Sequence, residues 1–248
     1  MSSKEDSLFL RFKQSINSIE LPAHFSMMQD GIPHPLCVLA AEELQTYIEQ
    51  QTQWKHNFGL NNYNTGTVIG KMFGVLVVEN TNKEIGYLAA FSGKLAGVNH
   101  HAKFVPPIFD TLATDGFLNK GMLALSALSE EIRVLELANV DKKKIEVLKL
   151  ERKQFSNNLQ NEIFEHYHFL NQAGEEKSLL EIFRAFDYKN PPAGAGECAG
   201  PKLLQYAFQH QLKPLAIAEF WWGLSPKSAQ WKHKQFYACC KEKCEPIL

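Results

Sequence analysis

The sequence predicts an α+β fold in which a sheet-containing body carries a protruding helical hairpin or coiled coil. Two observations support this prediction: apolar, β-branched runs at 72–78 and 85–91, and a stretch at 122–170 that lacks Gly and Pro and is rich in Leu, Glu and Lys. The first pattern is typical of strands and the second of helices. At 248 residues and 45% hydrophobic composition, the chain is long enough to bury a core without disulfides.

The first part, residues 1–118, is expected to be an α+β segment built around a β-hairpin at 71–91. Its two strands flank a polar turn at 80–83, and both are apolar on both faces. Strands of this kind lie deep in a sheet. A helix is expected over 41–53, after a Pro-rich loop.

The second part, residues 119–172, is expected to be a helical arm. Its apolar residues recur every three to four positions in two sets, and the sets fall out of phase across 138–141. This pattern favours an antiparallel helix pair, with Asp141 capping the second helix. One long helix with a stutter is the alternative. A purely structural arm, or one that makes a homodimer, is an alternative function for the chain.

The third part, residues 173–248, is expected to be a Cys-containing α/β segment that packs on the first. A helix is predicted from Cys198 to His210, and a buried strand at 215–222. Gly194 and Gly196 precede that helix and could present backbone amides to an anion. The alternative is a tight connection that needs glycine dihedral angles.

Cysteines cluster in this last part, where four of the five in the chain lie. Cys198 is at the predicted helix start, a position that lowers a thiol pKa. Cys240 and Cys244 are four residues apart and would share a helix face. With His233 they form a sulfur-rich set of the kind that zinc prefers. The alternative is that the cysteines are reduced and partly buried, with no ligand role.

The C-terminal tail combines basic and aromatic residues, which can neutralise phosphates and stack on unpaired bases. The candidate RNA-binding residues are Lys227, Trp231, Lys232, Lys234, Phe236, Tyr237, Lys241 and Lys243. A solvated basic face with its aromatic side chains turned inward is the alternative. Because the net charge of the chain is only −1, any contact with nucleic acid must come from such a local patch.

The order of these elements also suggests an enzyme alternative. A helix that starts at a Cys, then a strand, then a Cys pair is the layout of zinc-dependent nucleobase deaminases. Those enzymes need an acid/base Glu just after the first ligand, whereas Ala199 and Gly200 follow Cys198 here.

The sequence contains no signal-peptide pattern and no run of about 18 apolar residues. A cytoplasmic protein without membrane contact is therefore expected. The odd number of cysteines also argues against a disulfide framework.

Several strings of the sequence resemble a signature of long RluA-type RNA pseudouridine synthases. They are PPAGAGECA at 191–199 with PKLL at 201–204, the AEFWWG core at 218–223, and the closing FY at 236–237 with Cys240, Cys244 and EPIL at 245–248. The segment at 70–97 also fits the upstream part of these proteins. Where the family usually has Pro before Ala-Cys, this chain has Ala238, Cys239 and Cys240.

The resemblance implies a role in uridine-to-pseudouridine isomerisation in rRNA or tRNA. The family's catalytic Asp lies in an Arg-Leu-Asp motif on a separate C-terminal domain, and this chain contains no such motif. The resemblance therefore implies an N-terminal accessory, RNA-facing module. Its partners would be RNA and the catalytic domain of the full-length protein. No catalytic residue of this chain is assigned.

Overall fold

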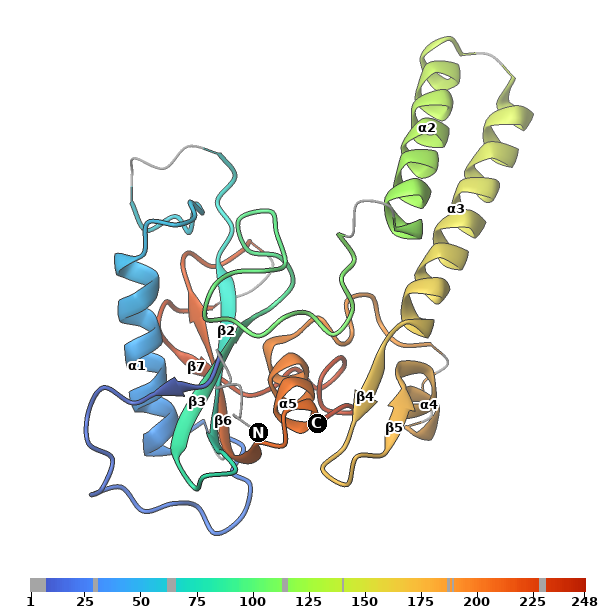
Figure 1. Cartoon of the computed structure of the whole chain (residues 1–248). Coiled ribbons are helices and arrows are strands. Elements are labelled where there is room, and N and C mark those ends of the chain that lie inside the picture. Colours follow the sequence, from blue (N-terminus) through green and yellow to red (C-terminus); the bar gives the residue numbers. More distant parts are fainter. Residues whose placement is uncertain are drawn as a thin grey trace. The chain divides into compact units, whose positions relative to one another are not determined.

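The computed structural model describes residues 8–28, 31–61, 66–112, 116–139, 141–186, 188, 190–227 and 231–248. In this part of the chain the fold is mixed α+β, with a five-stranded antiparallel sheet and five helices (Figure 1). The chain forms two compact units. The first comprises Met1–Ile108, Phe169–Lys177 and Gly194–Leu248, and the second comprises Phe109–His168 and Ser178–Ala193. The three-part division at 118/119 and 172/173 stays a prediction.

The main sheet lies in the first unit and has the strand order β1-β3-β2-β6-β7. Its strands are β1 (Leu10–Arg11), β2 (Lys71–Glu79), β3 (Ile85–Phe91), β6 (Lys213–Trp222) and β7 (Phe236–Tyr237). The predicted hairpin is confirmed, because β2 pairs antiparallel with β3, with Val75 opposite Ala89. On its other edge β2 pairs with β6, which the sequence predicted as a buried strand.

A helix covers each face of this sheet, which explains why β2 is apolar on both sides. Val75 and Val77 belong to a core shared with α1 (Pro35–Gln50), whereas Leu76 and Val78 belong to a second core shared with α5 (Ala199–Gln209). Figure 1 shows α1 and α5 on opposite sides of the strands. The expected helix at 41–53 in fact begins at Pro35, since proline is well suited to the first helical turn.

The start of α5 packs closely against the centre of the sheet. A Cβ atom on Gly74 of β2 would lie 2.8 Å from the Cβ of Ala199, so only glycine allows this approach. Cys198 is the residue just before α5 and serves as its N-cap. Gly74 thus allows the start of α5, and with it Cys198, to lie close to the sheet.

The second unit contains α2 (Phe117–Leu137), α3 (Lys142–Glu165) and α4 (Leu179–Ala185). The first two are antiparallel neighbours: Arg152 Nε donates to Ser129 Oγ at 2.6 Å, and Lys149 forms an ion pair with Glu136 at 2.7 Å. Asp141 caps α3 as predicted, because its side chain accepts a hydrogen bond from the backbone N–H of Lys144. That the pair protrudes from a body stays a prediction.

Two further strands, β4 (His168–Leu170) and β5 (Glu176–Ser178), form a separate two-stranded sheet. Ser178 and Glu181 then make a capping box that begins α4. Within the residues described, no helix has both the length and the hydropathy that crossing a bilayer requires.

Candidate functional site

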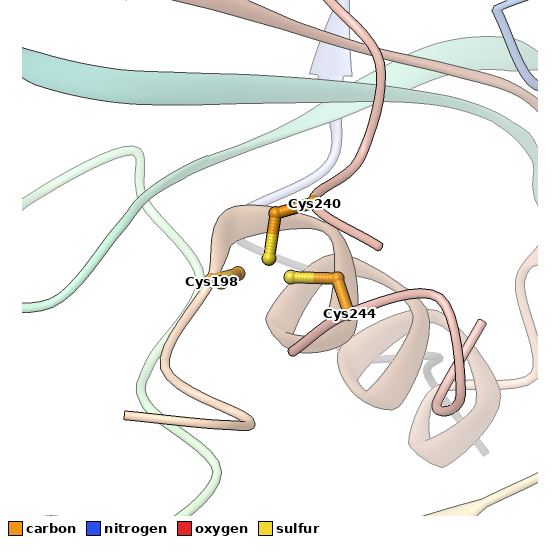
Figure 2. A group of neighbouring side chains, drawn as sticks. All are labelled: Cys198, Cys240 and Cys244. Carbon is orange, nitrogen blue, oxygen red and sulfur yellow. The ribbon is translucent and has the colours of Figure 1, made fainter. Parts of the chain in front are cut away.

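Three cysteines from distant parts of the sequence meet beside the N-terminus of α5 (Figure 2). The Sγ atoms of Cys198, Cys240 and Cys244 all lie within 4.8 Å of one another. Figure 2 shows the three side chains converging from the loop before α5 and from the C-terminal turn. Cys244 is buried, Cys198 is half-buried and Cys240 is exposed, so the group lies at the surface with one open side.

Backbone pairing holds the tail in this position. β7 pairs with β6, with Tyr237 opposite Glu219, and the chain then turns so that the N–H of Cys244 donates to the carbonyl of Cys240 at 3.1 Å. This single turn places both sulfurs on the same side, as the four-residue spacing predicted, although no regular helix forms here. Leu248 packs on the core beneath α5 and anchors the end of the turn.

The proximity of the three sulfurs affects their protonation. For Cys198, hydrogen bonding with Cys240 lowers the pKa, but hydrogen bonding with Cys244, burial and the charge of Glu219 together raise it well above the ordinary value. Hydrogen bonding with Cys198 and burial likewise raise the pKa of Cys240. In the metal-free chain, burial and the neighbouring sulfurs therefore act against the thiolate that a helix N-terminus favours.

His233, the expected fourth ligand, is not part of this group. Its Nδ1 accepts a hydrogen bond from the backbone N–H of Gly223 at 3.1 Å, and its ring packs edge-on against Trp222. Cys239 is also outside the group and lines a small cavity with Glu219. Successive side chains of an extended chain point to opposite sides, so the thiol of Cys239 is directed away from that of Cys240.

The predicted anion-binding loop adopts the conformation that glycine permits. Gly194 and Gly196 have φ angles of 77° and 85°, as the tight-connection alternative requires. A Cβ on Gly194 would lie 3.7 Å from the ammonium of Lys243, so a cation of the tail lies beside this loop. Anion binding there stays a prediction.

The aromatic residues of the predicted RNA-binding tail pack against the sheet. Trp231 stacks on Trp221 with ring centroids 5.6 Å apart, and Tyr237 meets Trp231 edge-on at 4.5 Å. Phe236 packs on Phe220. Each of these three tail residues is half-buried, so one part of each ring packs on the sheet edge and the other part stays exposed to solvent.

The lysines of the tail divide between two places. Lys234 makes an ion pair with Glu49 at 3.0 Å and lies over the ring of Trp222, near the end of α1. Lys243 lies beside Gly194, and its backbone N–H donates to Cys240 Sγ. The remaining three, Lys227, Lys232 and Lys241, are exposed.

A cavity of about 480 Å³ lies where the end of α1, the segment that follows it, β6 and the tail meet. Its lining includes the rings of Trp54, His56, Phe58, Trp222 and His233. Burial is the main cause that lowers the pKa of both histidines, which favours the neutral imidazole form. The sequence reasoning missed this site, because Trp222 and His233 lie more than 160 positions from the segment 48–61 that forms the rest of the lining, and no local motif marks the set.

Known families, curated proteins and solved structures give no match to this chain. Its function must therefore be inferred from its own residues. Of the strings that resemble the pseudouridine synthases, residues 194–204, 215–223 and 236–248 all belong to the first unit. They form the loop before α5, the helix itself, β6, β7 and the cysteine turn.

Sequence reasoning also missed two buried charged residues near the cysteines. Glu219 in β6 accepts a hydrogen bond from the N–H of Gly200 at 3.0 Å, and burial raises its pKa to about 7. Lys202 in α5 donates to the carbonyls of Phe91 and Gly93, and burial lowers its pKa to about 8. A single charged residue inside an apolar strand or helix face is the signal that could have identified them.

Proposed function

We propose that this chain is an RNA-facing accessory module of an RluA-like pseudouridine synthase, whose catalytic domain lies outside the chain and acts on rRNA or tRNA. The observation that carries the proposal is the ring-lined cavity beside exposed lysines. The resemblance of the strings around α5, β6 and the tail supports the choice of family. The proposal places the protein in the cytoplasm, where RNA and reduced cysteines occur together.

The lining of the cavity suits an unpaired nucleobase. A base can stack on an aromatic face, and its edge can form hydrogen bonds with polar side chains. Trp54 provides a half-buried aromatic ring and Asn61 provides an exposed amide, while Trp222 forms part of the wall and is only 2% exposed. The volume falls within the range of roughly 300–1,000 Å³ that is usual for small-molecule sites.

Lysines around the cavity can contact the phosphates that flank such a base. Lys55 lines the cavity and is exposed, and Lys232 is exposed in the adjoining tail. Lys234 is already paired with Glu49, so its contribution is smaller. Binding of this kind is dominated by phosphate contacts and weakens steeply with salt.

The proposal is tested by fluorescence anisotropy with a labelled single-stranded RNA over a series of salt concentrations. Replacing Lys55 and Lys232 by Ala should weaken binding and lower the slope of log affinity against log salt by about 1.4, that is, two phosphate contacts. The matched control is Lys142→Ala with Lys153→Ala on α3, which removes the same charge from exposed positions in the other unit. No binding at low salt, or an equal loss in both double variants, contradicts the proposal.

A second candidate is the zinc-dependent nucleobase deaminase. The favouring observation is that the cysteine group lies at the start of α5 and that the buried carboxyl of Glu219 hydrogen-bonds to Gly200, two residues after Cys198. Incubation of the chain with cytosine in free or RNA-borne form separates the two functions. If the chain is an RNA-facing module, it releases no ammonia. Metal-dependent release of ammonia would instead support the deaminase function and contradict the module.

A structural role of the α2–α3 pair is the third candidate. For this role we propose that the pair protrudes from the sheet-containing body. Leu123, Val134 and Leu137 on α2 are 72%, 50% and 73% exposed, which leaves an apolar stripe at heptad spacing. Sedimentation of the chain with and without residues 119–172 tests a dimer through this stripe. If both forms are monomers, the dimerisation role is removed.

A further inference from the structure

The meeting of Cys198, Cys240 and Cys244 is more than the proposed RNA contact requires. Cys198 and Cys240 are 42 positions apart in the sequence, yet all three sulfurs lie within 4.8 Å of one another. Two cysteines in such proximity could be a packing contact or a disulfide. Three that converge on one point, from two separate segments, match the arrangement of ligands around a thiophilic metal ion.

The distances agree with this interpretation. Zinc binds cysteine sulfur at about 2.3 Å, so two sulfurs of a tetrahedral site are about 3.8 Å apart. An upper limit of 4.8 Å between every pair leaves only small side-chain adjustments to reach that geometry. A disulfide would involve two of the three sulfurs and leave the position of the third unexplained.

Backbone N–H donors lie beside the group and would stabilise its negative charge. A zinc ion with three thiolates has a net charge of −1. The backbone N–H of Lys243 points at Cys240 Sγ at 3.3 Å, and the N-terminus of α5 lies at Cys198. Backbone donors of this kind are the outer partners that usually orient metal ligands.

We propose that Cys198, Cys240 and Cys244 bind one zinc ion through their three sulfur atoms. The fourth position faces solvent on the side of Cys240 and takes a water molecule or an added ligand, because no other His, Cys, Asp or Glu of the described chain joins the group. The zinc ion fastens the C-terminal turn to the start of α5. The inference does not depend on RNA binding.

The chain provides its own matched control for this assignment. Cys239 is adjacent to Cys240 and has the same chemistry, but it lies outside the group. His233 is the residue that sequence spacing favoured as a ligand, and its Nδ1 is instead engaged with Gly223. Replacing either residue should leave zinc binding intact, whereas replacing any one of the three cysteines should not.

The experiment measures zinc by elemental analysis in the full chain, purified under reducing conditions, loaded with zinc and freed of excess metal. The wild-type chain, Cys239→Ser and His233→Ala should each retain about one zinc ion per chain. Cys198→Ser, Cys240→Ser and Cys244→Ser should each lose most of it. A wild-type chain that retains no zinc, or a loss in Cys239→Ser equal to that in Cys240→Ser, overturns the proposal.

A second measurement covers variants that fail to fold. Cobalt added to the wild-type chain should produce the absorption bands of thiolate-to-metal charge transfer. Added zinc should displace the cobalt ion and abolish these bands. Cys240→Ser carries its substitution at the exposed position, so of the three variants it should disturb the core least. If this variant folds and gives the same cobalt spectrum as wild type, the three-sulfur assignment is wrong. A disulfide detected by mass in the reduced, zinc-loaded protein also refutes it.

Discussion

At the scale of single residues, Glu219 illustrates how burial changes the chemistry of an ordinary carboxyl group. It lies in β6 between Ala218 and Phe220, and its side chain accepts a hydrogen bond from the N–H of Gly200. Loss of hydration disfavours the charged form, so burial raises its pKa from 4.5 to about 7. The folded chain therefore binds a proton that the unfolded chain releases at a lower pH.

We predict that the stability of the chain falls as pH rises from 5 to 8 because of this residue. The folded-state pKa is raised, so the stabilising contribution is complete below about pH 4.5 and is lost as pH rises through about 7. The difference of about 2.5 pKa units corresponds to roughly 3 kcal/mol. Glu219→Gln keeps an acceptor for Gly200 but cannot ionise, and should remove this part of the slope. Urea unfolding at several pH values measures it; parallel slopes for wild type and variant would refute the prediction.

Gly74 makes a second prediction at the residue scale. A Cβ there would lie 2.8 Å from the Cβ of Ala199 and 3.0 Å from Leu203 Cδ1, so Gly74→Ala should push α5 away from the sheet. Overpacking of this kind costs about 1–3 kcal/mol in the free energy of unfolding. Adding Ala199→Gly should recover part of the loss, as contacting residues couple. Denaturant unfolding of both variants checks this, and a double variant no better than the sum of its parts argues against direct contact.

At the scale of secondary-structure elements, the junction between α2 and α3 depends on one residue. Asp141 has a φ angle of 45°, in the left-handed region, and its carboxylate accepts a hydrogen bond from the N–H of Lys144. Asp and Asn tolerate this backbone conformation better than other non-glycine residues. The second helix therefore begins where both the cap and the dihedral angle favour it.

We predict that Asp141→Ala destabilises the second unit by about 1 kcal/mol through loss of the N-cap. Asp141→Asn keeps the side-chain acceptor and the tolerance for positive φ, so it should lose much less. Thermal unfolding followed by circular dichroism compares the two variants. Equal losses in both would mean that the charge near the helix N-terminus, rather than the cap, is the stabilising feature.

At the scale of the whole molecule, the tail and α5 belong to the same unit and meet at the cysteine turn. The edge strand β7 has only two residues, and the cysteine turn adds Leu248 to the core. A metal ion at the cysteines would add the strongest link between the two. Metal binding then contributes directly to the stability of this part of the fold.

We predict that chelation of zinc loosens the C-terminal turn before any other part of the chain. Hydrogen exchange should accelerate first at 240–248, whereas α2 and α3 in the second unit should keep their exchange rates. Cys239→Ser should respond to the chelator as wild type does, and zinc should restore protection in both. Uniform acceleration over both units would show that the metal has no local role.

Local patterns in the sequence determined much of the fold. The apolar runs of β2 and β3, the polar turn between them, the buried β6 and the cap at Asp141 each follow from neighbouring residues, and the structure confirms them. Such features depend on backbone geometry and on periodic burial, which a single segment specifies by itself. The clustering of cysteines also marked the region where three sulfur atoms meet.

Only the tertiary structure decided which side chains meet. It brought Cys198 to Cys240 and Cys244, placed His233 against Trp222 instead, and gathered the rings of the cavity from separate segments. It also decided the pKa of Cys198, because the field of neighbouring sulfurs and the loss of water depend on three-dimensional position. Spacing along the chain fixes distances within one turn or strand, whereas contacts between segments depend on how the sheet, helix and tail pack together.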